Sequence, residues 1–190
     1  VNQVQNENKK LSQELEELKT ENQRLSLVEE QNSSLLKLLE LDEKYPKYSK
    51  IGAYVAATDV GNWYDIFIIN KGTDHQVDKD MVVISQGGLV GKIMESGKNY
   101  SKVVSIIDDT STVTAESKRT GDVGFIKGEA SLMLDGLCFM EYIGSDAEII
   151  EGDEIITSTL SDIYPAGILI GHVREVTVDA TGLNKTAIIE

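Results

Sequence analysis

The sequence predicts a mainly β protein in which an N-terminal coiled-coil helix precedes two small β-barrels related by an internal repeat. Three observations predict this fold class. All 16 glycines lie at Gly52 or later and every aromatic residue lies at Tyr45 or later, so the first 44 residues lack both turn-forming glycines and large core side chains. That first segment carries a heptad repeat, and two stretches of the remainder resemble each other. A rod and a glycine-rich β region are therefore joined in one chain.

The rod is indicated by apolar residues that recur every seven positions. The residues at heptad positions d and a are, in order, Val4, Asn8, Leu11, Leu15, Leu18, Asn22 and Leu25. Almost all residues between them are polar, and such a narrow stripe is typical of a coiled-coil seam rather than of a helix docked on a globular core. Asparagine at position a favours a parallel two-stranded arrangement. We therefore predict that these seven residues form a homodimer interface.

The sequence also predicts where the helix ends. The heptad phase slips after Leu25, the apolar face widens between Leu35 and Leu41, and Pro46 ends the helix. At 1.5 Å per residue, the rod is about 60 Å long. We assign residues 1–47 to the dimerisation helix and its linker.

After residue 50, short β-rich runs alternate with turn residues, and no segment keeps a helical period long enough for a crossover helix. The candidate strands are Ile51–Ala57, Trp63–Ile69, Met81–Ser85, Leu89–Glu95, Val103–Ile107, Thr112–Ala115, Gly124–Lys127, Leu132–Leu134, Phe139–Ile143, Glu154–Thr157, Leu169–Val178 and Ala187–Ile189. This pattern predicts barrels or sandwiches and not a doubly wound parallel sheet.

An internal repeat divides the β region. Val77–Ser85 aligns without gaps to Ile150–Ser158, and Leu89–Glu95 aligns to Leu169–Glu175. We therefore predict a first barrel at residues 48–112 and a second at residues 113–190, with the terminal strand open to exchange between them. The connection inside the second copy is longer, which is where a specialised contact surface is expected.

Composition limits the function. The chain has 18 Lys and Arg against 32 Asp and Glu, a net charge of −14, which argues against a basic nucleic-acid-binding surface. Residues 49–190 hold 22 acidic and 11 basic residues, which favours a specific protein partner over bulk-charge adhesion to anionic lipid or wall polymer. One cysteine, Cys138, excludes an intrachain disulfide, and one cysteine with two distant histidines offers no metal-ligand spacing. We expect neither a metal nor a cofactor.

Two alternatives to a scaffold stay open. A serine hydrolase would use Ser158 as nucleophile and His172 as base, although the chain has no G-x-S-x-G nucleophile setting. The run Gly87–Ile93 departs from a phosphate-binding loop, because its spacing is one residue short and Ile93 stands where Ser or Thr would hold magnesium. The second alternative is a soluble coiled-coil adaptor unrelated to the cell envelope. No apolar run approaches the roughly 20 residues of a membrane-spanning helix.

Several motifs, taken in order, resemble the bacterial rod-shape-determining MreC family. They are GLVGKI at Gly88–Ile93, VSIIDDTSTV at Val104–Val113, RTGDVGFIKG at Arg119–Gly128, GDEIITS at Gly152–Ser158, YPAGI at Tyr164–Ile168 and IGHV at Ile170–Val173. A leucine-rich coiled coil before them matches the family as well. The chain departs from the usual T-S-G pattern at Thr159, Ser161 and Asp162, which affects the expected conformation of that loop.

The resemblance implies a non-catalytic scaffold of lateral cell-wall elongation. It implies a coiled-coil homodimer on the extracytoplasmic face of the bacterial cell membrane, with a single-pass anchor upstream. It further implies a link from the MreB cytoskeleton, through MreD and RodZ, to the elongation-specific penicillin-binding transpeptidase. As candidate partner-binding residues we select Ile163, Tyr164 and Pro165 in the second-copy loop, and Phe125 and Lys127 in the 125–128 hairpin.

Overall fold

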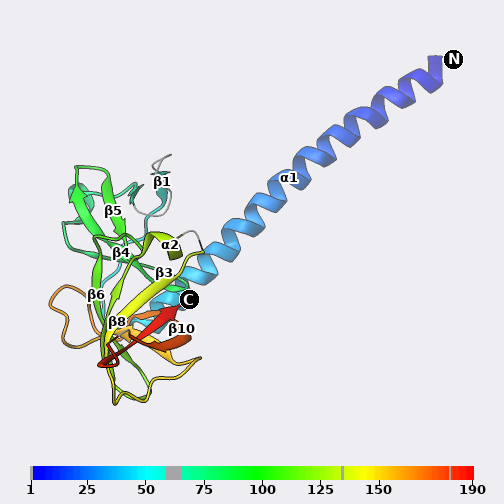
Figure 1. Ribbon diagram of the computed structural model, residues 1–190. Helices are drawn as coiled ribbons and strands as arrows, with labels where there is room; N and C mark the ends of the chain where they lie inside the picture. The colour runs from blue at the N-terminus through cyan, green and yellow to red at the C-terminus, as the bar shows by residue number, and fades with distance from the viewer. Residues whose placement is uncertain (1, 59–65, 134, 180) are drawn as a thin grey trace. The chain divides into compact units, whose positions relative to one another are not determined.

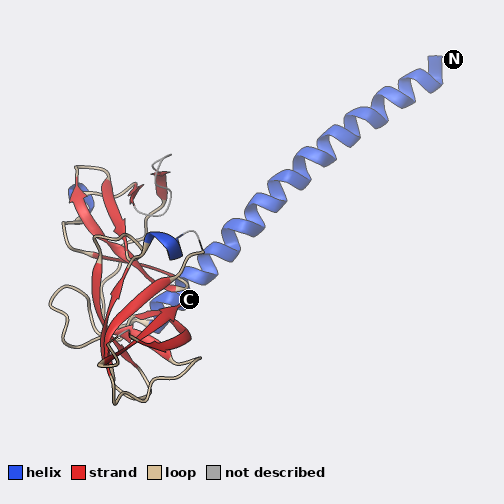
Figure 2. Cartoon of the chain, in the orientation of Figure 1, coloured by secondary structure: helices blue, strands red, loops and turns tan. Residues whose placement is uncertain are grey.

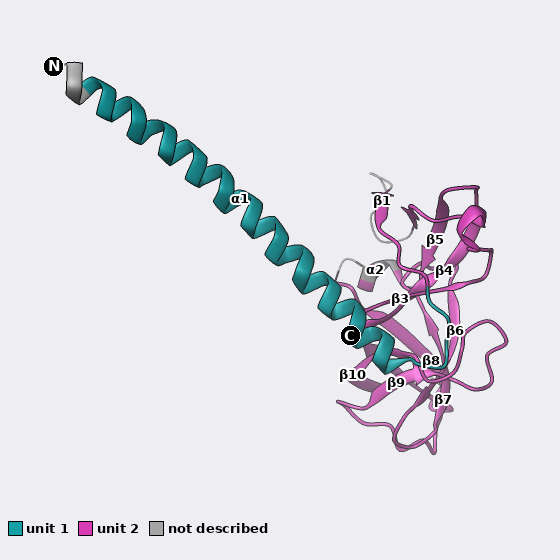
Figure 3. Cartoon of the chain, turned by 180° about the vertical axis from the view of Figure 1, so that it is seen from behind, with its two compact units in different colours: residues 1–50 teal, residues 51–190 magenta. Residues whose placement is uncertain are grey.

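The computed structural model describes residues 2–58, 66–133, 135–179 and 181–190. It divides into two compact units, Val1–Lys50 and Ile51–Glu190 (Figure 3). The first unit is a long helix and the second consists mainly of strands (Figure 2). The chain is thus mainly β with one long N-terminal helix, as predicted.

The helix α1 spans Asn2–Lys44 (Figure 1). It ends where the N–H of Tyr45 donates to the carbonyl of Leu41, and Pro46 follows, which disfavours the helical conformation of the residue before it. The charged residues along α1 form local pairs, such as Arg24 with Glu21 at 2.7 Å. Within the described residues, no helix has both the length and the hydropathy needed to cross a bilayer.

A five-stranded antiparallel sheet forms the first part of the β unit, in the order β1-β2-β5-β4-β3. Its strands are β1 Val55–Thr58, β2 Ile66–Ile69, β3 Val82–Ser85, β4 Gly88–Ser96 and β5 Ser101–Ser105. Ile69, Val77, Ile93 and Val103 form its core. The predicted first barrel is therefore corrected to a sheet: in the described residues β1 pairs only with β2, and all four β1 side chains are exposed, so the strands do not close.

The second part is a closed six-stranded barrel, in the order β10-β11-β8-β7-β6-β9. Its strands are β6 Thr112–Ser117, β7 Val123–Lys127, β8 Cys138–Gly144, β9 Glu154–Thr157, β10 Leu169–Val178 and β11 Asn184–Ile189. Val113, Ile126, Met140, Ile143 and Ile155 are fully buried, as expected where alternate residues of each strand fill a small barrel. The terminal strand β11 lies between β8 and β10 and so belongs to this barrel.

One predicted strand is replaced by a helix, and several others begin or end at different residues than predicted. Of the segment expected as a strand at Leu132–Leu134, Leu132 and Met133 lie instead in a short helix, α2 (Ala130–Met133), and residue 134 lies outside the described residues. Ala, Leu and Met are strong helix formers, and the N–H of Leu132 donates to the carbonyl of Glu129, which starts the turn. The strand expected at Trp63–Ile69 is observed from Ile66, and its first three residues lie outside the described residues.

The two aligned sequence segments form similar strand pairs. β3 pairs with β4 and β9 pairs with β10, each with a register shift. Gly91 lies opposite Val83, whereas Gly171 lies opposite Ile155, which the sequence alignment matches to Val82. The first strands are therefore offset by one residue relative to the gapless alignment. The internal repeat itself stays a prediction.

Candidate partner-binding surface

The predicted dimer residues lie on α1, and their side chains are open to solvent. Leu11, Leu15, Leu18 and Leu25 are between 46% and 66% exposed, and Asn8 and Asn22 are also exposed. The side chain of Val4 lies outside the described residues. A row of leucines this exposed leaves apolar surface in water, which a second helix would cover.

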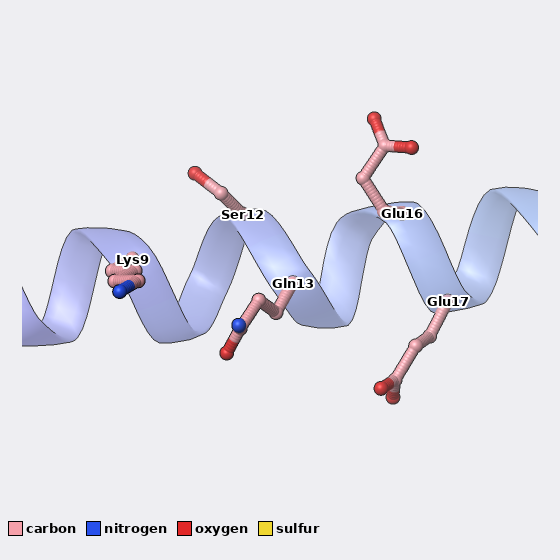
Figure 4. Close-up of a pocket in the computed structure, with 5 residues that line it drawn as sticks. All are labelled: Lys9, Ser12, Gln13, Glu16 and Glu17. Carbon is pink, nitrogen blue, oxygen red and sulfur yellow. The ribbon is translucent and has the colours of Figure 1, made fainter.

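A shallow hollow on α1 is lined by Lys9, Ser12, Gln13, Glu16 and Glu17 (Figure 4). All five residues come from one helix, and their side chains point to different sides of it, with Ser12 and Glu16 away from Gln13 and Glu17 (Figure 4). Such an open surface cannot enclose a small molecule.

Phe125 and Lys127, both selected from the sequence, lie on the outer face of β7 and are exposed. The ring of Phe125 contacts the ring of Tyr142 on β8 edge to face, with centroids 6.1 Å apart and planes at 83°. Tyr142 is 62% exposed. Tyr142 was not selected from the sequence, because the regular alternation of inward and outward side chains along a strand does not indicate which residue departs from it.

The loop between β9 and β10 is only partly available to a partner. Ile163 is 45% exposed and Pro165 is half-buried, but Tyr164, also selected as a candidate partner-binding residue, is only 3% exposed. The loop is folded back because the Pro165 carbonyl accepts a hydrogen bond from the Thr157 hydroxyl at 2.5 Å. Burial raises the pKa of Tyr164, against a smaller opposing effect of the Ser111 hydroxyl. Tyr164 therefore packs inside the β unit.

An ion pair fixes the turn of the β6–β7 hairpin. The Arg119 guanidinium donates to both carboxylate oxygens of Asp153, at 2.6 and 2.8 Å, and to the Glu148 carbonyl at 2.7 Å. Asp153 is 6% exposed and also accepts from the N–H of Ile150. The hydrogen bond from Arg119 holds the pKa of Asp153 below its ordinary value. This pair joins the hairpin that carries Phe125 to the loop before β9.

The residues of the hydrolase alternative do not form a catalytic arrangement. Ser158 is fully buried, and its hydroxyl donates to Glu116 at 2.6 Å and accepts from the N–H of Leu160. His172 is exposed on β10. The thiol of Cys138 is buried, which raises its pKa to about 11 and so disfavours the thiolate. Among the described residues, no three His, Cys, Asp or Glu side chains converge as metal ligands.

Sequence comparisons identify relatives along almost the whole chain. A family model described as "Rod shape-determining protein MreC, barrel core" matches residues 55–190. The cell shape-determining protein MreC of Bacillus subtilis is 31% identical over 192 residues, covering 97% of this chain and 66% of the relative. The Listeria monocytogenes protein is 29% identical and is covered over 63% of its length. The chain thus spans slightly less than two thirds of these relatives.

Structure comparisons agree. An MreC structure superposes with a TM-score of 0.76 at 23% identity, covering 85% of this chain and 90% of that chain. MreC from Listeria monocytogenes gives 0.68 at 27% identity, covering 97% and 88%. MreC from Helicobacter pylori, solved in complex with a penicillin-binding protein, gives 0.58 at 17% identity, covering 73% and 83%. With the family model matching most of its length, the chain belongs to the rod shape-determining protein MreC family.

Proposed function

We propose that this chain is the non-catalytic, dimeric scaffold region of a machine that elongates the lateral cell wall and so maintains rod shape. Family membership is the observation that carries this proposal. Its location on the extracytoplasmic face, its membrane anchor and its links to MreD, RodZ and MreB are part of the proposal. Because the chain spans 63% of the Listeria monocytogenes relative, these links concern the whole protein.

Dimerisation through α1 is supported by the exposed seam. Leucines at Leu11, Leu15 and Leu18 repeat along one stripe, while the residues between them are polar. Pairing two such stripes removes apolar surface from water. Asn8 and Asn22 within the stripe can hydrogen-bond across a two-fold axis, which favours two parallel, in-register helices.

The partner proposed for the barrel is the elongation-specific penicillin-binding transpeptidase. A Helicobacter pylori MreC with the same fold was solved with a penicillin-binding protein. The outer face of β7 and β8 supports this proposal, because Phe125 and Tyr142 are large exposed aromatic residues of the kind enriched at protein interfaces. Ile163 adds an exposed apolar side chain in the β9–β10 loop.

The two alternatives receive less support. A serine hydrolase needs an accessible nucleophile beside a base, whereas Ser158 is fully buried and bonded to Glu116. An adaptor unrelated to the envelope is disfavoured by family membership. Neither alternative has an observation in its favour.

Photocrosslinking in cells tests the transpeptidase proposal. A photoreactive residue at Phe125 is expected to form an adduct with the transpeptidase. The matched control is His172, which is exposed on β10, three strands away from β7 in either direction around the six-stranded barrel. Adducts of equal yield at both positions, or none at Phe125, would contradict a partner on the β7–β8 face.

A further inference from the structure

Two consecutive residues of β8 point out of the barrel, which a regular strand does not permit. Met140 and Ile143 are fully buried, whereas Glu141 is half-buried and Tyr142 is largely exposed. The pairing with β11 gives the reason. Met140 lies opposite Ala187 and Ile143 lies opposite Lys185, so two residues of β8 face one residue of β11. This is a β-bulge, a feature that re-aims side chains.

The bulge holds Tyr142 in an uncommon backbone conformation. Its φ is 58°, in the left-handed region that bulky residues rarely adopt. Glycine or asparagine would adopt this conformation with less strain. An aromatic residue at such a position is a reason to look for a function, because strained residues cluster at ligand-binding and recognition sites.

The consequence of the bulge is that a carboxylate and an aromatic ring are neighbours on one outer face. Phe125 lies directly opposite Glu141 in the β7–β8 pairing and contacts Tyr142 edge to face. In an edge-to-face pair, the ring whose edge makes the contact has neither of its two faces covered by the other ring. Glu141, Phe125 and Tyr142 are called the β7–β8 triad below.

Glu141 carries the charge of the triad. Among the residues that the structure describes, no hydrogen bond or ion pair involves its carboxylate. A half-buried carboxylate beside exposed ring faces attracts a cation that can use both features. The planar guanidinium group does so best, since it stacks on aromatic rings and pairs with a carboxylate, whereas an ammonium is a compact and strongly hydrated charge.

We propose that the β7–β8 triad is a receptor for one arginine side chain of a protein partner. The inference rests on the proposed scaffold function, because it names the chemistry that the partner presents to this face. Residues 49–190 hold 22 acidic and 11 basic residues, and this negative net charge also favours a basic partner segment. Tyr142 supplies the ring, Glu141 the counter-charge, and Phe125 holds the tyrosine ring in place.

A titration with single amino-acid probes tests the receptor. The chain, labelled with carbon-13 in its Phe and Tyr rings, is titrated with N-acetylarginine amide, N-acetyllysine amide or the neutral N-acetylcitrulline amide, and ring resonances are followed by NMR. We expect saturable shifts of the Tyr142 and Phe125 signals with arginine, at an apparent affinity about tenfold above citrulline, since one charge-assisted contact is involved. Equal responses to arginine and citrulline, or to arginine and lysine, would overturn the proposal.

Variants separate the receptor from a structural role. Glu141→Gln keeps the side-chain shape and is expected to abolish the preference for arginine, whereas the matched control Glu151→Gln, at an exposed turn position, is expected to keep it. Tyr142→Gly removes the ring but suits the positive φ, so we expect lost arginine binding with no lower melting temperature. A lower melting temperature with arginine binding retained would assign Tyr142 a purely structural role.

Binding to the transpeptidase distinguishes a failure of the receptor proposal from a failure of the scaffold proposal. If the chain binds the transpeptidase and Glu141→Gln binds it equally well, the receptor is wrong and the scaffold stands. If the parent chain does not bind the transpeptidase at all while arginine still shifts the Tyr142 ring, the receptor stands and the transpeptidase is not its partner.

Discussion

At the scale of single residues, the barrel depends on a few polar contacts that close its loops. The Arg119–Asp153 pair is the clearest case, because the carboxylate is buried and accepts hydrogen bonds from Arg119 and from the N–H of Ile150. The Ser158–Glu116 bond acts similarly at the start of the β9–β10 loop. These contacts explain why residues that look catalytic or merely charged in the sequence have structural roles.

Asp153→Asn should destabilise the chain. The substitution keeps the shape but removes the charge that Arg119 pairs with, and a cost of about 1–3 kcal/mol is expected for a disrupted buried polar contact. Chemical denaturation at neutral pH measures it. Asp109→Asn, at an exposed position in a turn, is the control and should leave stability unchanged. Equal stability of the Asp153 variant and the parent would show that the pair contributes nothing.

The same pair gives a dependence on pH. Because Arg119 lowers the pKa of Asp153 in the folded chain, Asp153 contributes stability at pH values above its unfolded pKa, near 3.8. This contribution is lost as the pH falls through the lower folded pKa. The stability gap between parent and Asp153→Asn should therefore shrink on acidification below that value, measured by thermal unfolding across pH 7 to 2. A gap that widens toward low pH would contradict the assigned cause.

At the scale of elements, most strands could be predicted because turn residues and β-rich runs mark them clearly. β9 and β10 match their predicted bounds. By contrast, α2 replaces a predicted strand, because local helix propensity determines the conformation of this short segment. The bulge at Tyr142 could not be predicted, since it depends on pairing with β11, far along the chain. Burial of Tyr164 likewise depends on tertiary packing and not on local sequence.

Gly171 tests how closely neighbouring strands approach in the barrel. A side chain at Gly171 would place its Cβ 2.2 Å from the carbonyl oxygen of Glu190, which is backbone and cannot move aside. Gly171→Ala should therefore destabilise the chain by at least about 1–3 kcal/mol, as other overpacked sites do. Gly87→Ala is the matched control, because no atom lies within 4 Å of its added Cβ. Similar melting temperatures for both variants would contradict the packing described for β10.

The seam of α1 makes a prediction about association. Replacing Leu11, Leu15 and Leu18 with lysine places charges at core positions of the proposed coiled coil, so the chain should sediment as a monomer. The control replaces Asn6, Gln13 and Thr20 with lysine, which adds the same charge at heptad position f, outside the seam. Sedimentation equilibrium should find this control dimeric. A dimer that survives the leucine substitutions would move the interface to the β unit.

At the scale of the whole molecule, family membership and the two units suggest a division of labour. In the proposed function, the polar helix with its leucine stripe would associate two chains, and the acidic β unit would recognise a partner. The charge distribution was readable from the sequence, as was the family. The face of the barrel proposed for recognition was predicted only in part, since Phe125 was selected from the sequence but its neighbours Glu141 and Tyr142 were not.

We propose above all that this chain binds an elongation-specific transpeptidase through the β7–β8 face. Sedimentation velocity of the chain mixed with the extracytoplasmic region of that enzyme from the same bacterium tests it most directly. We predict a complex containing two copies of the chain, formed by the parent and by His172→Ser but lost in Phe125→Ser. Absence of a complex with the folded parent chain, or a complex that tolerates Phe125→Ser, would contradict the claim.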